Sequence, residues 1–447
     1  MKLTRRHFLK TQLGAVTAAT LPAWVPASVL GQNAPSNRVT LGCIGVGPRG
    51  RAVLGGFLPQ PDCQVVALSD IFGRNLKAAV AQVQKAYDGK APVLHHNFQD
   101  LLARADIDAV VIATPDHWHV PAALAAAQAG KDIYLEKPMG LSVEADQRLR
   151  AACRRGKRVF QFGTQQRSSG QFRLACELVR NGRIGKLEHI NVWAPASRPG
   201  GSTDPINPPE DLDYPTWLGT APRTPYTLGK ACDEQGAWKT WWFNADYALG
   251  FIAGWGVHPL DIAYWGFPGM MQGIVKLEGT GVIPEEGACN TATAWDVKFR
   301  FANGVTMRFR GTRNGAEPSK LNDLSEWKKK YGRITGHGTA FNGSDGWVLV
   351  DRGQIRTWPE NLVETQFGPG AIRLPRSSNH ARNFLDAVKS RRSAISPIED
   401  AVQADILCHL SNIAVRLGRK LKWNGGREQF LNDDTANQCL KPRSARV

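Results

Sequence analysis

The chain has 447 residues, of which 42% are hydrophobic and 21% are charged, and its formal net charge is +17. This composition is typical of a globular protein with two or three domains, and it excludes a chain that is disordered over most of its length. The positive charge would suit a nucleic-acid partner, but the sequence has no recognition motif for nucleic acid. We therefore expect only non-specific attraction to anions.

The first segment with a clear pattern is the N-terminus. The pair Arg5-Arg6 precedes a weakly apolar run over residues 13–30. This order is typical of a twin-arginine export signal, so we predict a signal peptide over residues 1–33 and an exported, periplasmic protein. A disordered basic tail is the alternative. The run holds too many Thr, Pro and Gly residues for a membrane span, so we expect no stable span after cleavage.

A glycine motif follows a short apolar strand predicted at residues 39–44. Gly45, Gly47 and Gly50 are spaced as G-x-G-x-x-G, and a helix-like segment comes after them. The first glycine permits a tight turn, the second lets a pyrophosphate approach the backbone, and the third allows close packing of helix on strand. A glycine-rich turn without a ligand is the alternative. The order strand, turn and helix favours a dinucleotide site.

A second predicted strand, at residues 64–69, ends in Asp70. A carboxylate at this place would accept hydrogen bonds from both hydroxyls of the adenosine ribose and would repel a 2′-phosphate. We therefore expect NAD rather than NADP as the cofactor. Arg74, four residues further on, would weaken that preference if its side chain reached the same place.

Strands and helices continue to alternate after Asp70. A β-branched strand is predicted at residues 109–114, a helix at 120–128, and a further strand before Glu136-Lys137-Pro138. Alternation at this spacing predicts an α/β fold with a doubly wound parallel sheet. We assign this first domain to residues 34–162.

The pattern changes in a second domain, residues 163–447. Residues 195–225 are rich in proline and indicate an extended surface excursion near the cleft. The predicted strands suit one mostly antiparallel open sheet, and two amphipathic helices come near the end. The strands are expected at 274–277, 292–301, 305–310, 346–350 and 421–424, and the helices at 378–390 and 398–417.

Together these motifs resemble the Gfo/Idh/MocA family, which includes glucose-fructose oxidoreductase and inositol dehydrogenase. Besides the glycine motif and Asp70, the resemblance rests on Thr114-Pro115, His119 and Glu136-Lys137-Pro138, and it continues through residues 256–261 and 379–384. It implies a Rossmann domain followed by an α/β domain with a large open sheet, and a substrate between that sheet and the nicotinamide. It also implies cofactor contacts from Thr114, Pro115, His119, Glu136 and Lys137.

The resemblance further implies that Lys137 is catalytic and that Glu136 borders the nicotinamide. Oxidation of a carbinol moves a hydride to the cofactor and needs a base for the hydroxyl proton. A lysine at the edge of an apolar sheet can have its ammonium form disfavoured by desolvation. The resemblance implies a cis bond between Lys137 and Pro138 as well. A surface turn is the alternative interpretation of Glu-Lys-Pro alone.

His258 and Asp261 are three residues apart and would share one face of a helix. The resemblance implies that His258 binds or deprotonates the reacting hydroxyl, and we place Asp261 in the substrate site with it. Two departures from the family pattern matter. Gly254 stands where many family dehydrogenases have an aspartate, which puts a conventional proton relay in doubt. Asp116 stands where the family often has asparagine.

Five tryptophans fall within a short stretch, and aromatic faces suit the apolar faces of a sugar ring. We expect Trp242 and Trp255 to contact the substrate, with Gln165 and Arg167 from the loop after residues 158–162. The alternatives are ordinary core packing and ordinary polar loop residues. The five are Trp238, Trp241, Trp242, Trp255 and Trp265.

We predict no metal site, because neither His95-His96 nor His117-x-His119 has a well-spaced third ligand. The expected protein is an exported NAD-dependent oxidoreductase that acts at a carbinol of a sugar, cyclitol or glycoside. Export also suggests a retained cofactor and a redox-neutral cycle. The alternatives are an NAD-dependent glycosidase and a non-catalytic NAD-binding protein. The expected partner is a small carbohydrate, and we expect a homo-oligomer.

Overall fold

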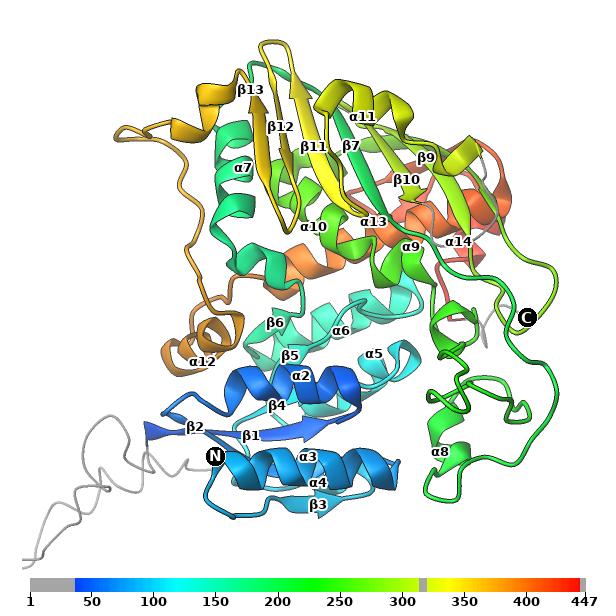
Figure 1. Ribbon diagram of the computed structural model, residues 1–447. Helices are drawn as coiled ribbons and strands as arrows, with labels where there is room; N and C mark the ends of the chain where they lie inside the picture. The colour runs from blue at the N-terminus through cyan, green and yellow to red at the C-terminus, as the bar shows by residue number, and fades with distance from the viewer. Residues whose placement is uncertain (1–36, 313–319, 443–447) are drawn as a thin grey trace, which may run out of the picture. The chain divides into compact units, whose positions relative to one another are not determined.

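The structure is a computed structural model that describes residues 37–312 and 320–442 (Figure 1). The predicted signal peptide, residues 1–33, lies outside the described residues. Within the described part of the chain, no helix is both long enough and apolar enough to cross a membrane.

The first sheet has six parallel strands in the order β3-β2-β1-β4-β5-β6, which confirms the predicted doubly wound sheet. Its strands are buried on both faces where they are longest, as their apolar runs require. The strands are β1 (Val39–Ile44), β2 (Cys63–Ser69), β3 (Val93–His95), β4 (Ala109–Ile112), β5 (Asp132–Leu135) and β6 (Phe160–Phe162). The strand β3, which is short and exposed, was not predicted.

The helices between these strands cover the sheet. They are α2 (Pro48–Phe57), α3 (Gly73–Ala86), α4 (Phe98–Leu102), α5 (Asp116–Gln128) and α6 (Val143–Gly156). α5 begins at Asp116, earlier than the predicted start at residue 120.

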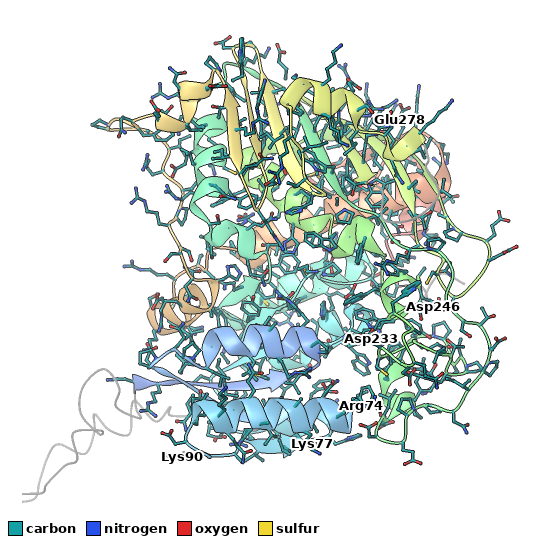
Figure 2. The ribbon with its side chains drawn as sticks, viewed as in Figure 1. Arg74, Lys77, Lys90, Asp233, Asp246 and Glu278 are labelled. Atoms are coloured by element: carbon teal, nitrogen blue, oxygen red, sulfur yellow. The ribbon has the colours of Figure 1, made fainter. Side chains whose placement is uncertain are left out.

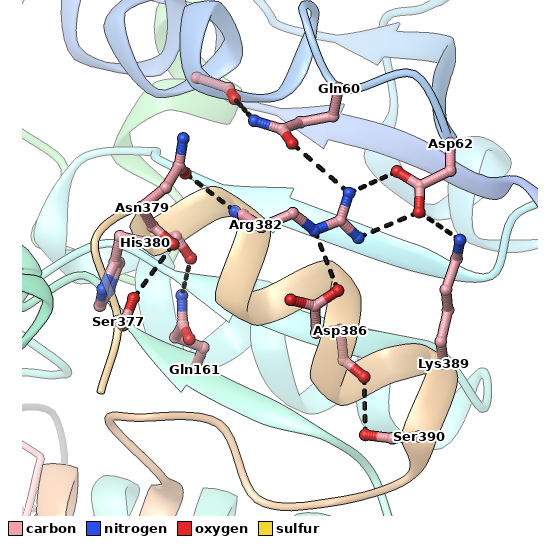
Figure 3. A network of polar contacts seen from close by, with 11 residues as sticks. Gln60, Asp62, Gln161, Ser377, Asn379, His380, Arg382, Asp386, Lys389 and Ser390 are labelled. Atoms are coloured by element: carbon pink, nitrogen blue, oxygen red, sulfur yellow. Dashed lines mark hydrogen bonds and ion pairs between the residues drawn. The ribbon is translucent and has the colours of Figure 1, made fainter. Parts of the chain in front are cut away.

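A helix from the end of the chain returns to this first sheet. α12 (His380–Ser390) packs on α2, and Phe384 and Leu385 join the core on that face of the sheet. Arg382 and Lys389 both bind Asp62, which lies just before β2 (Figure 3). The first sheet is therefore completed by a segment more than 300 positions away in the sequence.

The second sheet has nine strands in the order β13-β12-β11-β7-β10-β9-β8-β14-β15. Only β7 and β10 pair in parallel, so the predicted mostly antiparallel sheet is confirmed. The strands are β7 (Leu187–Pro195), β8 (Ile274–Val282), β9 (Ala294–Arg300), β10 (Thr306–Thr312), β11 (Gly338–Gly343), β12 (Trp347–Val350), β13 (Ile355–Trp358), β14 (Leu421–Asn424) and β15 (Gln429–Phe430).

Helices connect the two sheets. α13 (Ile398–Leu417) contacts β8 on one side and α6 on the other, and α10 (Val257–Gly266) packs between α13 and strands β7 and β11 (Figure 1). α7 (Gly170–Arg180) covers β12 and β13. Most of these helices are buried nearly all round, as expected for helices between two layers.

The segment between β7 and α9 (Phe251–Gly254), residues 196–250, is called the strap below. It is the predicted proline-rich excursion and extends further than residue 225. The strap contains α8 (Tyr214–Leu218) and has its own aromatic cluster, in which Tyr214, Trp217 and Tyr247 pack against Phe72 of the first domain. Figure 1 shows the strap in green beside α3 and α4. The excursion therefore packs against the Rossmann domain.

Candidate active site

A cavity of about 960 Å³ lies at the carboxyl ends of the parallel strands. Its wall comes from the glycine loop, the ends of β2, β4 and β5, the strap, and α9 and α10 of the second domain. This is the crevice where open α/β sheets bind ligands. Its volume is at the upper end of the usual range for small-molecule sites, which suits a dinucleotide together with a substrate.

The glycine loop is shaped for close approach by a ligand. Gly45 has φ +76°, and a Cβ there would lie 2.6 Å from the Thr114 nitrogen. A Cβ at Gly50 would lie 2.0 Å from the Gly45 oxygen, so the turn needs both glycines. A Cβ at Gly47 would meet nothing closer than Asn75 at 3.5 Å. Gly47 therefore leaves space at the start of α2, where backbone N–H groups favour an anion.

Asp70 lies at the end of β2 and lines the cavity. One carboxylate oxygen accepts a hydrogen bond from the Val46 nitrogen at 2.8 Å, and the other accepts from the Phe72 nitrogen at 2.9 Å. Burial raises the pKa of Asp70 to about 6. These bonds fix the carboxylate in place, as a ribose-binding acid requires.

Thr114, Pro115, His119 and Glu136 also line the cavity. His119 is buried, its Nδ1 bonds the Pro138 oxygen at 2.6 Å, and its Nε2 has no partner among the described residues. Glu136 accepts from Arg49 at 2.6 Å and from the Gln165 amide at 2.8 Å. Burial alone would raise the pKa of Glu136, but the Arg49 guanidinium holds it below its usual value.

Lys137 projects into the same cavity, and its bond to Pro138 is cis. Its Nζ donates a hydrogen bond to the Gly254 carbonyl oxygen at 2.7 Å. Burial lowers the pKa of Lys137, and the charges of Glu136 and Asp116 oppose that shift. Asp116 is buried at the start of α5, and burial raises its pKa to about 8. Burial therefore favours the uncharged form of both Lys137 and Asp116, compared with an exposed lysine or aspartate.

His258 lies near the start of α10 and lines the cavity opposite the Rossmann domain. It is 3% exposed, and its Nδ1 has no hydrogen-bond partner in the described chain. Burial, with the nearby charges of Lys137 and Arg352, lowers the pKa of His258 well below its ordinary value. The imidazole is therefore neutral at neutral pH and able to accept a proton.

Arg167 and Asp261 do not reach the cavity, contrary to the prediction. They are 1% and 0% exposed, form an ion pair at 2.6 Å, and Arg167 also binds Asp400 at 2.5 Å. A buried charge must be paired, and this pair joins the loop after β6 to α10. Gln166, the neighbour of Arg167, lines the cavity instead, and neither end of its buried amide has a partner among the described residues.

The tryptophans divide between cavity and core. Trp242 lines the cavity and is 39% exposed, so its ring is available to a ligand. Trp255 also lines the cavity, but the Arg352 guanidinium lies over its ring, 4.8 Å from the centroid. Trp241 lines the wall too. Trp238 and Trp265 lie outside the cavity: Trp238 packs on Phe243, and Trp265 packs under the Arg167 guanidinium.

Three cavity cations were not predicted: Arg49, Lys239 and Arg352. Arg49 occupies one of the x positions of the G-x-G-x-x-G motif, and the motif does not specify which residue stands there. Lys239 belongs to the strap, and Arg352 lies in the turn after β12, where only the Asp-Arg-Gly sequence hints at a tight turn.

Of the histidines considered as metal ligands, His96, His117 and His119 have other partners. His117 Nε2 bonds the Trp217 oxygen at 2.7 Å, and His119 bonds the Pro138 oxygen. Outside the cavity, Asp146, Asp405 and His409 form a fully buried cluster. His409 pairs with the two carboxylates at 3.2 and 3.3 Å, and Asp405 accepts from the Met139 nitrogen. These contacts make the cluster a support for the loop that carries Lys137.

The strap holds Arg74 away from the cavity. Arg74 donates to both carboxylate oxygens of Asp211 at 2.8 and 3.1 Å, and its own backbone N–H also bonds that acid. Figure 2 shows Arg74 at the end of α3 that faces the strap. Asp213, which is two residues after Asp211 in the strap, binds His96 at 2.9 Å. The strap is thus tied to the Rossmann domain beside the end of the cavity that holds Asp70.

Two family models match the chain. Residues 39–164 match the NAD-binding Rossmann fold of the Gfo/Idh/MocA oxidoreductase family, and residues 366–446 match an oxidoreductase-family C-terminal alpha/beta domain.

Among curated relatives, a glycosyl hydrolase family 109 protein of Shewanella sp. (strain W3-18-1) is 31% identical over 204 residues. An alpha-N-acetylgalactosaminidase of Shewanella oneidensis is 30% identical over 204 residues. Each alignment covers 41% of this chain and 44% of the relative, so the chain spans less than half the length of the curated relatives it matches.

Solved structures resemble the chain over most of its length. The aldose-aldose oxidoreductase from Caulobacter crescentus has a TM-score of 0.60 at 17% identity and covers 86% of this chain and 99% of its own. The WlbA dehydrogenase from Bordetella pertussis, solved with NADH and UDP-GlcNAcA, has a TM-score of 0.61 at 16% identity and covers 86% and 98%. At this identity the likeness shows the shared fold.

Proposed function

The chain has the NAD-binding oxidoreductase fold of the Gfo/Idh/MocA family, and from that premise we propose that it is an NAD-dependent enzyme acting at a carbinol of a sugar, cyclitol or glycoside. The observation that carries the proposal is the meeting of two acid–base groups in one cavity. Lys137 and a neutral His258 line the same space as the glycine loop. A non-catalytic NAD-binding protein would not need this pair.

The cofactor in this proposal is NAD, held by the backbone of Gly45 and Gly47 at the start of α2 and by Asp70. Two features favour it over NADP. The Asp70 carboxylate disfavours a 2′-phosphate, and the charge of Arg74 is already matched by Asp211. When bound, NAD takes a hydride from the substrate carbon and can return it.

Lys137 and His258 move the proton in the proposed reaction. One N–H of Lys137 is directed to the Gly254 carbonyl, which aims the remaining N–H groups at a substrate hydroxyl. The neutral imidazole of His258 accepts the hydroxyl proton as the carbinol becomes a carbonyl, and it returns that proton in the reverse step. Gln166 supplies an unused amide for a neighbouring hydroxyl.

The proposal includes export by a signal at residues 1–33 and a cofactor that is not exchanged. Outside the cytoplasm there is no substantial pool of NAD, so the hydride must return to a sugar within each cycle. The strap supports retention, because it lines the cavity with Thr216 and Trp217 and is tied to α3 by Asp211. A segment tied beside the cofactor in this way should slow cofactor release.

A second candidate is an NAD-dependent glycosidase, which the curated relatives favour. In that cycle oxidation acidifies the C–H beside the new carbonyl, a base removes that proton, and the glycosidic oxygen leaves as an alcohol. Water then adds, and the hydride returns. The leaving oxygen needs an acid, and Asp116, with its raised pKa, lines the cavity as a protonated carboxyl that is able to donate.

The test uses the purified enzyme with its bound cofactor and no added NAD. Glycosides carrying deuterium at each candidate carbinol carbon are supplied, and reduced cofactor, aglycone and sugar are followed together. Sustained turnover without net reduced cofactor supports the redox-neutral cycle, and deuterium retained in a cleaved sugar identifies the glycosidase. Turnover that stops after one equivalent and resumes in proportion to added NAD would show a simple dehydrogenase. If the unmodified enzyme shows no more hydride transfer or cleavage than Lys137→Met, the protein is a non-catalytic NAD-binding protein.

A further inference from the structure

Arg352 is presented to the cavity by a rigid turn between β12 and β13. Asp351, which is fully buried, fixes this turn: its Oδ1 accepts from the nitrogens of Gly353 and Gln354 at 2.7 and 3.0 Å, and its Oδ2 accepts from the Thr335 hydroxyl at 2.9 Å. A side chain on so constrained a turn reaches the cavity without reorganisation of the backbone.

The guanidinium of Arg352 is not used by the protein. Among the described residues it makes no hydrogen bond or ion pair, and it lies over the Trp255 ring, 4.8 Å from the centroid. The other cavity arginine, Arg49, is bound to Glu136. Contact with a ring face holds a guanidinium while leaving its in-plane N–H groups free to bind an oxyanion.

The cavity around Lys137 has more positive than negative charge. Arg49, Lys137, Arg352 and Lys239 line it together with three acids, Glu136, Asp116 and Asp70. The excess is one positive charge when Asp116 is ionised and two when it is protonated. Lys137, Arg352 and Arg49 all line the cavity with His258, and their positive charges all lower the pKa of that imidazole. Like charges in a cavity repel, and an anionic ligand would relieve that repulsion.

A fourth cation lies further along the wall. Lys239 lines the cavity beside Trp242, with its Nζ 5.9 Å from the ring centroid. Its nearest acid, Asp233, is 3.9 Å away and largely exposed, so this pair is weak. Cations therefore flank two of the cavity tryptophans, Trp242 and Trp255.

We propose that the substrate is an acidic sugar and that Arg352 binds its carboxylate or sulfate, with Trp242 against the ring and Gln166 at a hydroxyl. The planar fork of an arginine matches both anions, so the shared chemistry is an oxyanion on the sugar. The oxidation of this sugar rests on the proposed function, but its binding does not, and the two can be tested apart.

The binding test titrates the purified enzyme, with its bound cofactor, by calorimetry. The probes are D-glucuronate and D-galacturonate, their neutral counterparts D-glucose and D-galactose, and D-glucose 6-sulfate. We expect at least one acidic sugar to bind about tenfold or more tightly than its neutral counterpart. Arg352→Gln should remove this preference. Arg356→Gln, in the same hairpin but outside the cavity, should keep it.

The turnover test compares 4-nitrophenyl β-D-glucuronide with the matching glucoside and records reduced cofactor and released nitrophenol. We expect a higher kcat/KM for the acidic glycoside in the unmodified enzyme and a loss of about tenfold or more with Arg352→Gln. The ratio of kcat/KM between the acidic and the neutral glycoside should fall to about one in this variant, because only the acidic substrate has a group for Arg352.

Each outcome decides between the ideas. A preference for the 6-sulfate over the uronates supports the acidic-sugar site and identifies the anion as sulfate. Equal binding of acidic and neutral sugars, no binding of either at millimolar concentration, or a preference that survives Arg352→Gln overturns it. Binding of acidic sugars through Arg352 without hydride transfer or cleavage would overturn the proposed function alone. Turnover of neutral sugars without any acidic preference would overturn this inference alone.

Discussion

Replacement of Asp211 by asparagine should make the protein accept NADP. Asp211 holds Arg74 through two side-chain bonds of 2.8 and 3.1 Å and accepts the Arg74 backbone N–H at 2.9 Å. Arg74 is four residues after Asp70, and its guanidinium lies over Phe72, which lines the cavity. Asparagine keeps the shape of Asp211 but loses its charge. The released guanidinium can then turn to a 2′-phosphate beside Asp70.

The expected size of the effect follows from the exposure of the pair. The two side chains are 52% and 37% exposed, so loss of their attraction should cost folding less than about 1 kcal/mol. Hydrogen bonds between Arg74 and a phosphate contribute about 1.5–3 kcal/mol, and repulsion from Asp70 offsets part of that. We expect a net gain of about 1.4 kcal/mol, which is tenfold tighter NADP binding. NAD binding should change less.

The assay titrates both cofactors into protein freed of bound nucleotide, for the unmodified chain, Asp211→Asn and Asp213→Asn. Asp213→Asn is the matched control, because it makes the same charge change in the same strap but leaves Arg74 paired with Asp211. The reasoning fails if NADP affinity does not rise in Asp211→Asn. It also fails if both variants gain equally, since the effect would then come from a looser strap.

Lys137→Met and His258→Asn should each lower turnover by about a hundredfold or more while leaving bound NAD and the circular dichroism spectrum unchanged, because each removes a positioned acid or base. Arg167→Met leaves the buried Asp261 carboxylate and the partly exposed Asp400 carboxylate without their partner and should lower the free energy of unfolding in urea by about 3–5 kcal/mol, with normal turnover per folded molecule. Burial lowers the pKa of His409, but its two buried carboxylate partners raise it to about 9, above the ordinary 6.5. Its stabilisation, on the order of 3 kcal/mol, is therefore complete below pH 6.5 and lost as pH rises through about 9. Melting temperatures over that range should fall for the unmodified protein and vary less for His409→Gln.

The Rossmann sheet could be predicted because its signals are local. Apolar strands, the spacing of three glycines and the acid at the end of β2 each occupy a few consecutive residues. Lys137 and His258 have weaker local signals, and they were predicted as site residues from the resemblance to a family. The structure places both in one cavity with Asp70.

The other site residues depend on contacts between distant segments. Arg167 and Gln166 are neighbours in a polar loop. Arg167 turns inward to Asp261 and Asp400, which are 94 and 233 residues away, whereas Gln166 lines the cavity. The pairing of Arg74 with Asp211 spans 137 residues. Arg352 lies at the tip of a hairpin whose second strand was not predicted. A single sequence gives no measure of such distances.

The two departures from the family pattern, Gly254 and Asp116, both act on Lys137. Gly254 stands where the resemblance implies an aspartate, and its carbonyl oxygen takes the hydrogen bond from Lys137. A carbonyl directs the amine without a full negative charge, so it does less than a carboxylate to keep the lysine protonated. Asp116 stands where the resemblance implies asparagine, and its charge acts on the same lysine. The resemblance would place the acid near Lys137 in the second domain, whereas in this chain it is at the start of α5. There its raised pKa makes it a proton donor, which elimination of a glycoside requires and simple oxidation of an alcohol does not.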